Sequence, residues 1–196
     1  MLSEQPEYPV PWRTTEYVDV RARAHELGCD VPSGVALLPG NFVTAVGRAE
    51  FRYHEVASQV REAWRGVGLE DSGPGRKLRP KDNAASGNPD QDIPLAVFFG
   101  TDLPNVSARP VLDALSMVAS VLTADPRVAR TREVRVDAIV ERPNSGGYLC
   151  LEYQGNVHEL VTLARPIREI QNGGPDVQEQ EARKRRSLSK QGGAGW

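Results

Sequence analysis

Hydrophobic residues concentrate in one long passage of the chain, residues 93–125. Its first part, Ile93–Phe99, is a short continuous apolar run closed by a glycine, a pattern typical of a buried strand. Pro94 has no amide hydrogen, so the strand should enter the sheet at that residue. Pro110 suits the first turn of a helix, which predicts a helix with apolar positions Val111, Leu115, Val118 and Leu122. We expect this strand and helix to form the centre of the fold.

The residues before this passage predict two helices and one strand. A threonine cap at residue 14 or 15 predicts a first helix that runs to about Leu27. The apolar run Val35–Leu38 is typical of a short buried strand. Apolar residues spaced by three, four and seven positions then predict a second helix over about residues 48–67.

The residues after the central helix predict a hairpin and a closing helix. Glu133–Glu141 alternates between apolar and polar residues, as a half-buried strand does. A turn rich in glycine and proline follows, and Tyr148–Tyr153 predicts the returning strand. A last helix should carry Val157, Leu160, Val161 and Ala164 on its apolar side, and Pro166 should kink or end it.

This order of elements predicts an α/β fold with a single domain at residues 14–172. Strands that alternate with helices favour right-handed parallel crossovers, and the hairpin adds an antiparallel edge. We therefore expect a mixed sheet of four or five strands with helices on both faces. Residues 1–13 form a predicted N-terminal arm, residues 70–92 a long flexible loop, and residues 173–196 a flexible charged tail.

Composition narrows the class of protein. The 196 residues are 39% hydrophobic and carry a formal net charge of −2, so the whole chain gives no reason to expect nucleic acid or an anionic membrane. Two cysteines are too few for a disulfide scaffold. No apolar leader or membrane span is found in the sequence, which predicts a cytoplasmic protein. Walker, GxGxxG, CxxC and GxSxG motifs are absent, so no catalytic residue, cofactor or metal is assigned.

The N-terminal arm predicts a contact with an apolar groove. Pro6, Pro9 and Pro11 favour an extended backbone. Tyr8 and Trp12 lie between and beside these prolines, so they could occupy a groove on this subunit or on a neighbouring one. The alternative is a terminus without a partner.

Two basic clusters predict contacts with an anion, nucleic acid or an acidic partner. The loop carries Arg76, Lys77 and Arg79, and the tail carries Arg183, Lys184, Arg185 and Arg186. Phosphate contacts from such clusters are nonspecific in sequence and weaken with salt. The alternative is that loop and tail have no fixed structure.

Acidic residues near strand ends are the candidates for chemistry. Asp102 follows the central strand, where open α/β sheets bind ligands, but a turn aspartate more commonly bonds a nearby backbone N–H, here predicted within residues 103–106. Asp137, Glu141 and Glu152 could gather across the hairpin as magnesium ligands; a solvated sheet face explains them equally. His25 and Cys29 have the spacing of a metal pair but also of an ordinary helix surface.

The sequence therefore favours a non-enzymatic interaction or assembly subunit of a bacterial cytoplasmic complex. Its partner would be another protein or a further copy of the chain, bound through the arm, the loop and the tail. One alternative is a small enzyme with its site near Asp102 under the loop at 70–92. A second alternative is a nucleic-acid-binding protein that uses the basic tail.

Overall fold

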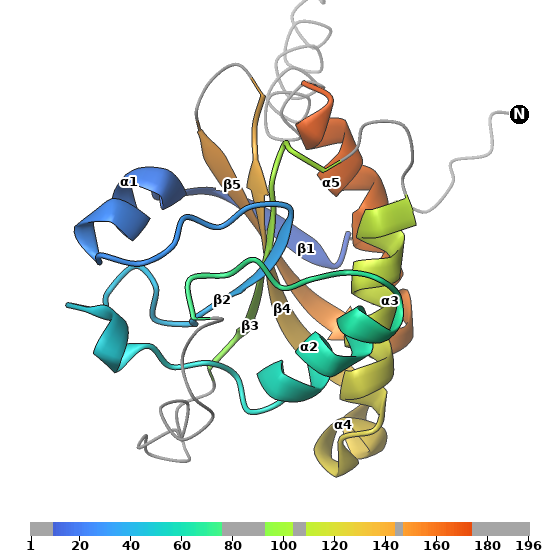
Figure 1. Ribbon diagram of the computed structural model, residues 1–196. Helices are drawn as coiled ribbons and strands as arrows, with labels where there is room; N and C mark the ends of the chain where they lie inside the picture. The colour runs from blue at the N-terminus through green and yellow to red at the C-terminus, as the bar shows by residue number, and fades with distance from the viewer. Residues whose placement is uncertain (1–9, 76–92, 104–108, 144–146, 174–196) are drawn as a thin grey trace, which may run out of the picture.

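A single five-stranded sheet organises the computed structural model, which describes residues 10–75, 93–103, 109–143 and 147–173 (Figure 1). The strand order is β1-β5-β4-β3-β2. The parallel pair is β3 and β4, and the other neighbours are antiparallel. The strands are β1 (Trp12–Tyr17), β2 (Val35–Leu38), β3 (Leu95–Phe99), β4 (Glu133–Glu141) and β5 (Tyr148–Asn156). The predicted mixed α/β sheet is confirmed.

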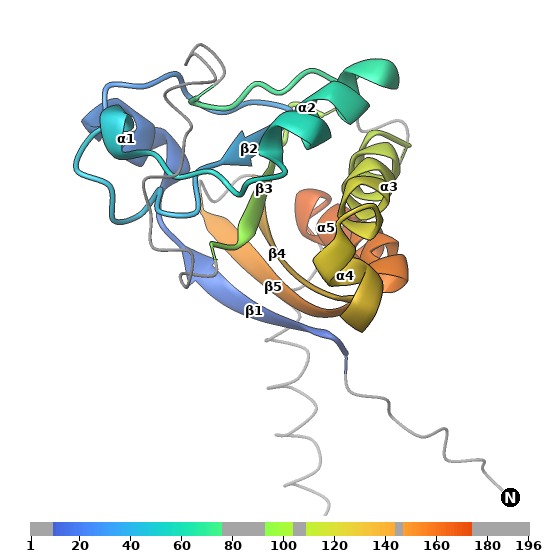
Figure 2. The ribbon, with the colours of Figure 1, turned by 90° about the horizontal axis from the view of Figure 1, so that it is seen from below.

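Helices lie on both faces of this sheet. The α-helices are α1 (Val20–Glu26), α2 (Ala57–Gly66), α3 (Arg109–Thr123), α4 (Pro126–Thr131) and α5 (Ala164–Gln171), and the 3₁₀ helices are η1 (Arg48–Glu50) and η3 (Val157–Leu163). Figure 2 shows α3, α4 and α5 on one side of the sheet and α1 on the other. Arg23 of α1 donates to the carbonyl oxygens of Phe42 and Ala45, which holds the neighbouring turn against this helix.

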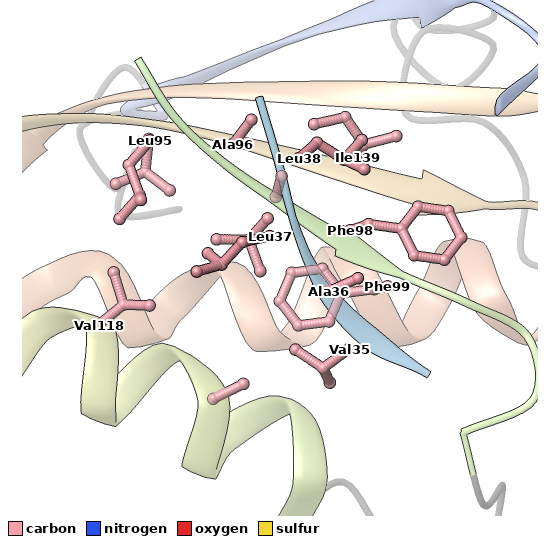
Figure 3. Close-up of a cluster of buried hydrophobic side chains, with 14 of the residues drawn as sticks. Val35, Ala36, Leu37, Leu38, Leu95, Ala96, Phe98, Phe99, Val118 and Ile139 are labelled. Carbon is pink, nitrogen blue, oxygen red and sulfur yellow. The ribbon is translucent and has the colours of Figure 1, made fainter. Parts of the chain in front are cut away.

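The predicted central strand and helix form the core. All five residues of β3 are buried, and α3 buries Val111, Ala114, Leu115, Val118 and Leu122. In Figure 3, Leu37 and Phe99 lie on the side of α3, whereas Leu38 and Ile139 lie on the opposite face. The indole N–H of Trp64 in α2 donates to the Ala114 carbonyl at 3.1 Å, which fixes α2 beside α3. An apolar helix is thus covered on more than one side, as its composition requires.

The prediction of a helix from residue 14 is wrong. Residues Trp12–Tyr17 form the edge strand β1, because they pair along their whole length with β5. The helix begins only at Val20, where the Asp19 carboxylate accepts the Ala22 N–H at 3.0 Å. A distant partner strand therefore decides the conformation of a segment that carries helix-capping threonines.

The expected parallel crossover from β2 to β3 is also wrong. Leu38 at the end of β2 lies opposite Ala96 near the start of β3. Strand β3 therefore begins at the end of the sheet where β2 finishes, and it runs antiparallel beside β2. The hairpin of β4 and β5 is confirmed, but it lies inside the sheet because β1 continues beyond β5.

Two helices differ from the predicted lengths. The second helix covers residues 57–66 only, and Phe51 and Tyr53 before it are buried outside any helix. The closing segment is a 3₁₀ helix followed by α5, and Pro166 lies in the first turn of α5. Pro166 was expected to kink or end the last helix; it does not end one, because it lies in the first turn of α5, where a proline loses no intrahelical hydrogen bond.

Candidate functional site

The carboxyl ends of the parallel strands meet at Glu141, the last residue of β4. Its side chain is 8% exposed. One oxygen accepts the backbone N–H and the hydroxyl of Thr101 at 2.9 and 3.0 Å, and the other accepts Arg21 Nε at 3.0 Å and the Tyr148 hydroxyl at 3.4 Å. Burial raises the pKa of Glu141, but the bonds from Thr101 and Arg21 outweigh it and hold the pKa below its ordinary value. Glu141 is therefore an ionised internal brace.

Asp102 braces a second loop at the same end of the sheet. Its two carboxylate oxygens lie 2.8 and 3.0 Å from the backbone nitrogen of Gly34, which donates to them. Gly34 has a φ of +57°, in the region that favours glycine. Asp102 thus bonds a backbone amide, as a turn brace does, but the amide precedes β2 and is not in residues 103–106. Residues 104–106 lie outside the described part of the chain.

Gln171 at the end of α5 completes this network. Its side-chain amide donates to the Gly100 carbonyl at 2.8 Å, and its Oε1 is buried without a hydrogen-bond partner. Strands β3 and β4, helices α1 and α5 and the start of β5 are therefore joined by polar bonds around one carboxylate. This end of the sheet is a polar network whose acids, Glu141 and Asp102, already accept from internal donors.

Two of the three hairpin carboxylates are brought together. Asp137 and Glu152 lie directly opposite each other on β4 and β5. Glu152 accepts from Arg13 of β1, whereas Asp137 Oδ1 is buried and has no partner. Burial, and then the nearby Glu152, raise the pKa of Asp137 against the influence of Arg135. Glu141 lies further along β4, beyond the buried Ile139, and forms the hydrogen bonds described above.

The described residues of these strands form neither a cluster of metal ligands nor an activated thiol. Within residues 10–75, 93–103, 109–143 and 147–173, no three His, Cys, Asp or Glu side chains gather as a metal site would require. Burial, followed by Asp137 and Glu152, raises the pKa of the Cys150 thiol to about 12. Such a thiol stays protonated at neutral pH and is a poor nucleophile.

A groove of about 340 Å³ lies at the opposite, amino end of the parallel pair. Its apolar surface comes from Ile93, Leu122, Val128 and Val134, and its polar groups are His54, Asp125, Arg127, Glu133, Arg135 and Gln154. Arg127 bonds Asp125 and Glu55, and His54 Nδ1 accepts the Val56 N–H at 3.2 Å. The sequence did not predict this groove, since its residues come from separate elements and share no local pattern.

Strand β1 is fixed to the hairpin from both faces of the sheet. Arg13 pairs with Glu152 on one face, and Glu16 accepts from Arg142 at 3.0 Å on the other. Trp12 is half-buried and packs against the core, while its indole N–H is buried without an acceptor. Trp12, which the sequence placed in the N-terminal arm, is therefore part of the sheet.

The two outer strands of the sheet, β2 and β1, differ in what lies along them. Along β2, the Ser72 N–H donates to the Val35 carbonyl at 3.3 Å and the Leu37 N–H donates to Asp71 at 2.9 Å. Asp71 also accepts from Arg61, so the segment after α2 is fastened along this edge. On the other side, β1 is the last strand of the sheet among the described residues; its Arg13 and Glu16 side chains are exposed, whereas Thr14 is buried.

The remaining predicted binding residues lie outside the described part of the chain: Tyr8, Arg76, Lys77, Arg79, Arg183, Lys184, Arg185 and Arg186. Comparisons with protein-family models, curated proteins and solved structures give no match. Among the described residues, no helix combines the length and the apolar character that crossing a bilayer requires.

Proposed function

We propose that this chain is a non-enzymatic interaction or assembly subunit that binds another protein or a further copy of itself. The observation that carries the proposal is the position of β1, which among the described residues is the last strand of the sheet and has exposed side chains at Val10, Arg13 and Glu16 in and next to it. A strand at the end of a sheet can offer backbone donors and acceptors to a strand of another chain. The arm with Tyr8 and the basic residues of the loop and tail would add contacts around it.

The carboxyl ends of the strands support a binding role over an enzymatic one. A general acid or base must reach a substrate and exchange a proton with it. The two acids at this end, Glu141 and Asp102, are instead occupied by donors from Thr101, Arg21 and Gly34. These hydrogen bonds account for both side chains as structural groups that hold neighbouring segments in place.

In-cell cross-linking followed by affinity capture tests the proposal. The tagged full-length chain is compared with Glu16→Pro, which removes one amide N–H from the outer edge, and with Glu16→Ala, which keeps it. We expect a cross-linked complex of fixed composition with the natural chain and with Glu16→Ala, and much less of it with Glu16→Pro. Recovery of the natural chain only as a monomer that is cross-linked neither to another protein nor to a second copy would refute the proposal.

A second candidate function, binding of a small ligand, is favoured by the groove at the amino end. Its volume lies at the lower end of the range for ligand pockets. The acidic Glu133 and the basic Arg135 on its rim would suit a zwitterion such as a free amino acid. A rise in melting temperature with one of the common amino acids, absent from Arg135→Ala, would support this function; no rise with any of them would remove it.

A further inference from the structure

We infer that the groove at the amino end binds a free L-amino acid with an apolar side chain, held by the first residues of β4, Glu133–Arg135. This inference rests on the second candidate function and names its ligand class. It follows from three features of the groove: unpaired backbone groups on β4, unpaired charges beside them, and an apolar wall.

The hydrogen bonds at the two ends of the β4–β5 pair show which backbone groups of β4 face away from β5. The Val157 N–H donates to the Arg132 carbonyl at 2.8 Å, and the Arg142 N–H donates to the Gly147 carbonyl at 2.9 Å. Hydrogen-bonded and non-bonded pairs alternate along antiparallel strands. Even-numbered residues of β4 therefore direct their backbone groups toward β5, and odd-numbered residues direct theirs toward the side of β3.

Strand β3 does not reach the first residues of β4. It begins at Leu95, which stands opposite Val136. The Glu133 carbonyl and the Arg135 N–H point to the side that β3 leaves uncovered, and no hydrogen bond joins either group to another described residue. Ile93, which precedes β3, lines the groove without bonding them. One backbone donor and one backbone acceptor are thus left for a ligand.

A single amino acid can complete this edge as a residue of a parallel strand would. In parallel pairing, a residue donates its N–H to one carbonyl of the neighbouring strand and accepts the N–H that lies two residues further along. The ligand's ammonium would donate to the Glu133 carbonyl, and its carboxylate would accept the Arg135 N–H. An amino acid bound in this way stands directly opposite Val134.

The side chains of Glu133 and Arg135 supply matching charges. Both side chains are exposed, and neither forms an ion pair or a hydrogen bond with the described residues. They lie on the same face of β4 with Cα atoms about 6.6 Å apart, because residues two apart on a strand share a face. Glu133 stands beside the place of the ammonium and Arg135 beside the place of the carboxylate. The order of the charges therefore agrees with the orientation that the backbone groups impose.

An apolar wall receives the side chain of the ligand. Val134 lies on the face of the sheet that α3 covers, because Ile139, five residues further on, points to the opposite face (Figure 3). Residues opposite each other on neighbouring strands share a face, so the ligand's side chain lies on the side of Val134. Leu122 of α3 and Val128 of α4 line the groove there. A D-amino acid held by the same two backbone groups would direct its side chain to the charged face instead.

The size and lining of the groove restrict the ligand further. Its volume of about 340 Å³ lies at the lower end of the range for ligand pockets, which suits one amino acid better than a peptide or a nucleotide. A polar side chain would lose water against the apolar wall without gaining a partner. The ligand class is therefore the apolar L-amino acids, for which L-leucine is the probe.

Isothermal titration calorimetry with the purified full-length chain tests the inference. We expect L-leucine to bind, and D-leucine, N-acetyl-L-leucine, L-leucinamide and L-serine to bind at least about tenfold more weakly. N-acetyl-L-leucine lacks the ammonium, L-leucinamide lacks the carboxylate, and L-serine lacks the apolar side chain. All five compounds are measured on the natural chain, so this comparison does not depend on the folding of a variant.

Two substitutions locate the site. Arg135→Ala should weaken L-leucine binding at least about tenfold. Arg130→Ala, which removes an exposed arginine of α4 outside the groove, should leave binding unchanged. Circular dichroism checks that each variant is folded.

The outcomes separate the inference from the function on which it rests. Binding that is lost in Arg135→Ala but does not distinguish L-leucine from D-leucine or L-serine would overturn the inference and leave the second candidate function standing. L-leucine binding that withstands Arg135→Ala in folded form would overturn both. No binding of L-leucine would overturn the inference, and the second candidate function would fall with it if no common amino acid raises the melting temperature.

Discussion

The bonds of Glu141 make a quantitative prediction about stability. Glu141→Gln keeps the size of the side chain but leaves one acceptor oxygen where the carboxylate has two. One oxygen serves Thr101 and the other serves Arg21 and Tyr148. Whichever way the amide turns, its NH₂ group faces donors that have lost their acceptor.

The magnitude follows from the geometry. Hydrogen bonds to a charged group contribute about 1.5–3 kcal/mol, and a buried donor left without an acceptor costs about 1–3 kcal/mol. Arg21 is 53% exposed, so solvent recovers part of its loss. The Tyr148 bond is 3.4 Å long and therefore weak. We expect Glu141→Gln to lower the free energy of unfolding by about 2–3 kcal/mol at neutral pH.

The pH dependence has a defined sign. The folded-state pKa of Glu141 lies below its ordinary value, so the native state binds its proton less tightly than the unfolded chain does. The resulting stabilisation is fully present above the unfolded-state pKa and is lost as the pH falls through the folded-state pKa. The difference between the natural chain and Glu141→Gln should therefore be largest at neutral pH and shrink in acid.

Urea unfolding followed by tryptophan fluorescence measures both effects. Glu62→Gln is the matched control, because Glu62 is exposed on α2 and the substitution is chemically identical. If Glu141→Gln stays within about 0.5 kcal/mol of Glu62→Gln at neutral pH, the brace does not hold the strand ends. A difference that grows in acid would contradict the pKa argument even if the stability loss were found.

Three further predictions concern the core, the second brace and the arm. Leu115→Ala in the fully buried face of α3 should lower the free energy of unfolding by about 2–5 kcal/mol; an unchanged melting temperature would refute the core assignment. Asp102→Asn should cost about 1 kcal/mol, since the amide oxygen can still accept the Gly34 N–H, and capture of a partner should be unaffected; loss of capture with stability retained would make Asp102 a binding residue. Trp12→Phe should lie within about 1 kcal/mol of the natural chain, because the indole N–H has no acceptor to lose, whereas Trp12→Ala should cost about 2 kcal/mol of packing; chemical denaturation of both variants distinguishes packing from a hydrogen bond.

The sequence predicted the elements whose stability is local or strongly periodic. The strand β3, the helix α3 and the hairpin of β4 and β5 each carry a clear apolar pattern, and each forms where it was expected. Strand β1 was missed because a six-residue edge strand derives its conformation from pairing with β5, far along the chain. No window of sequence contains that information.

The candidate site was predictable only in part. The position of Asp102 after a central strand follows from the fold, but its partner Gly34 is 68 residues away. Arg21 and Glu141 are separated by 120 residues, and no motif relates them. The groove at the amino end combines residues from the β4–β5 hairpin, α4 and the loop before α2, so its composition emerges only when these elements pack.

The pairing of β1 with β5 also has a consequence for how the chain folds during synthesis. Arg13 leaves the ribosome 139 residues before Glu152, its partner across the strands. At a translation rate of about 5–20 residues per second, the first strand waits roughly 7–28 s for the strand that shelters it. Contacts of such large sequence separation also slow folding. During this interval β1 lacks the strand with which it pairs in the folded sheet, so the sheet can be completed only after β5 has been synthesised.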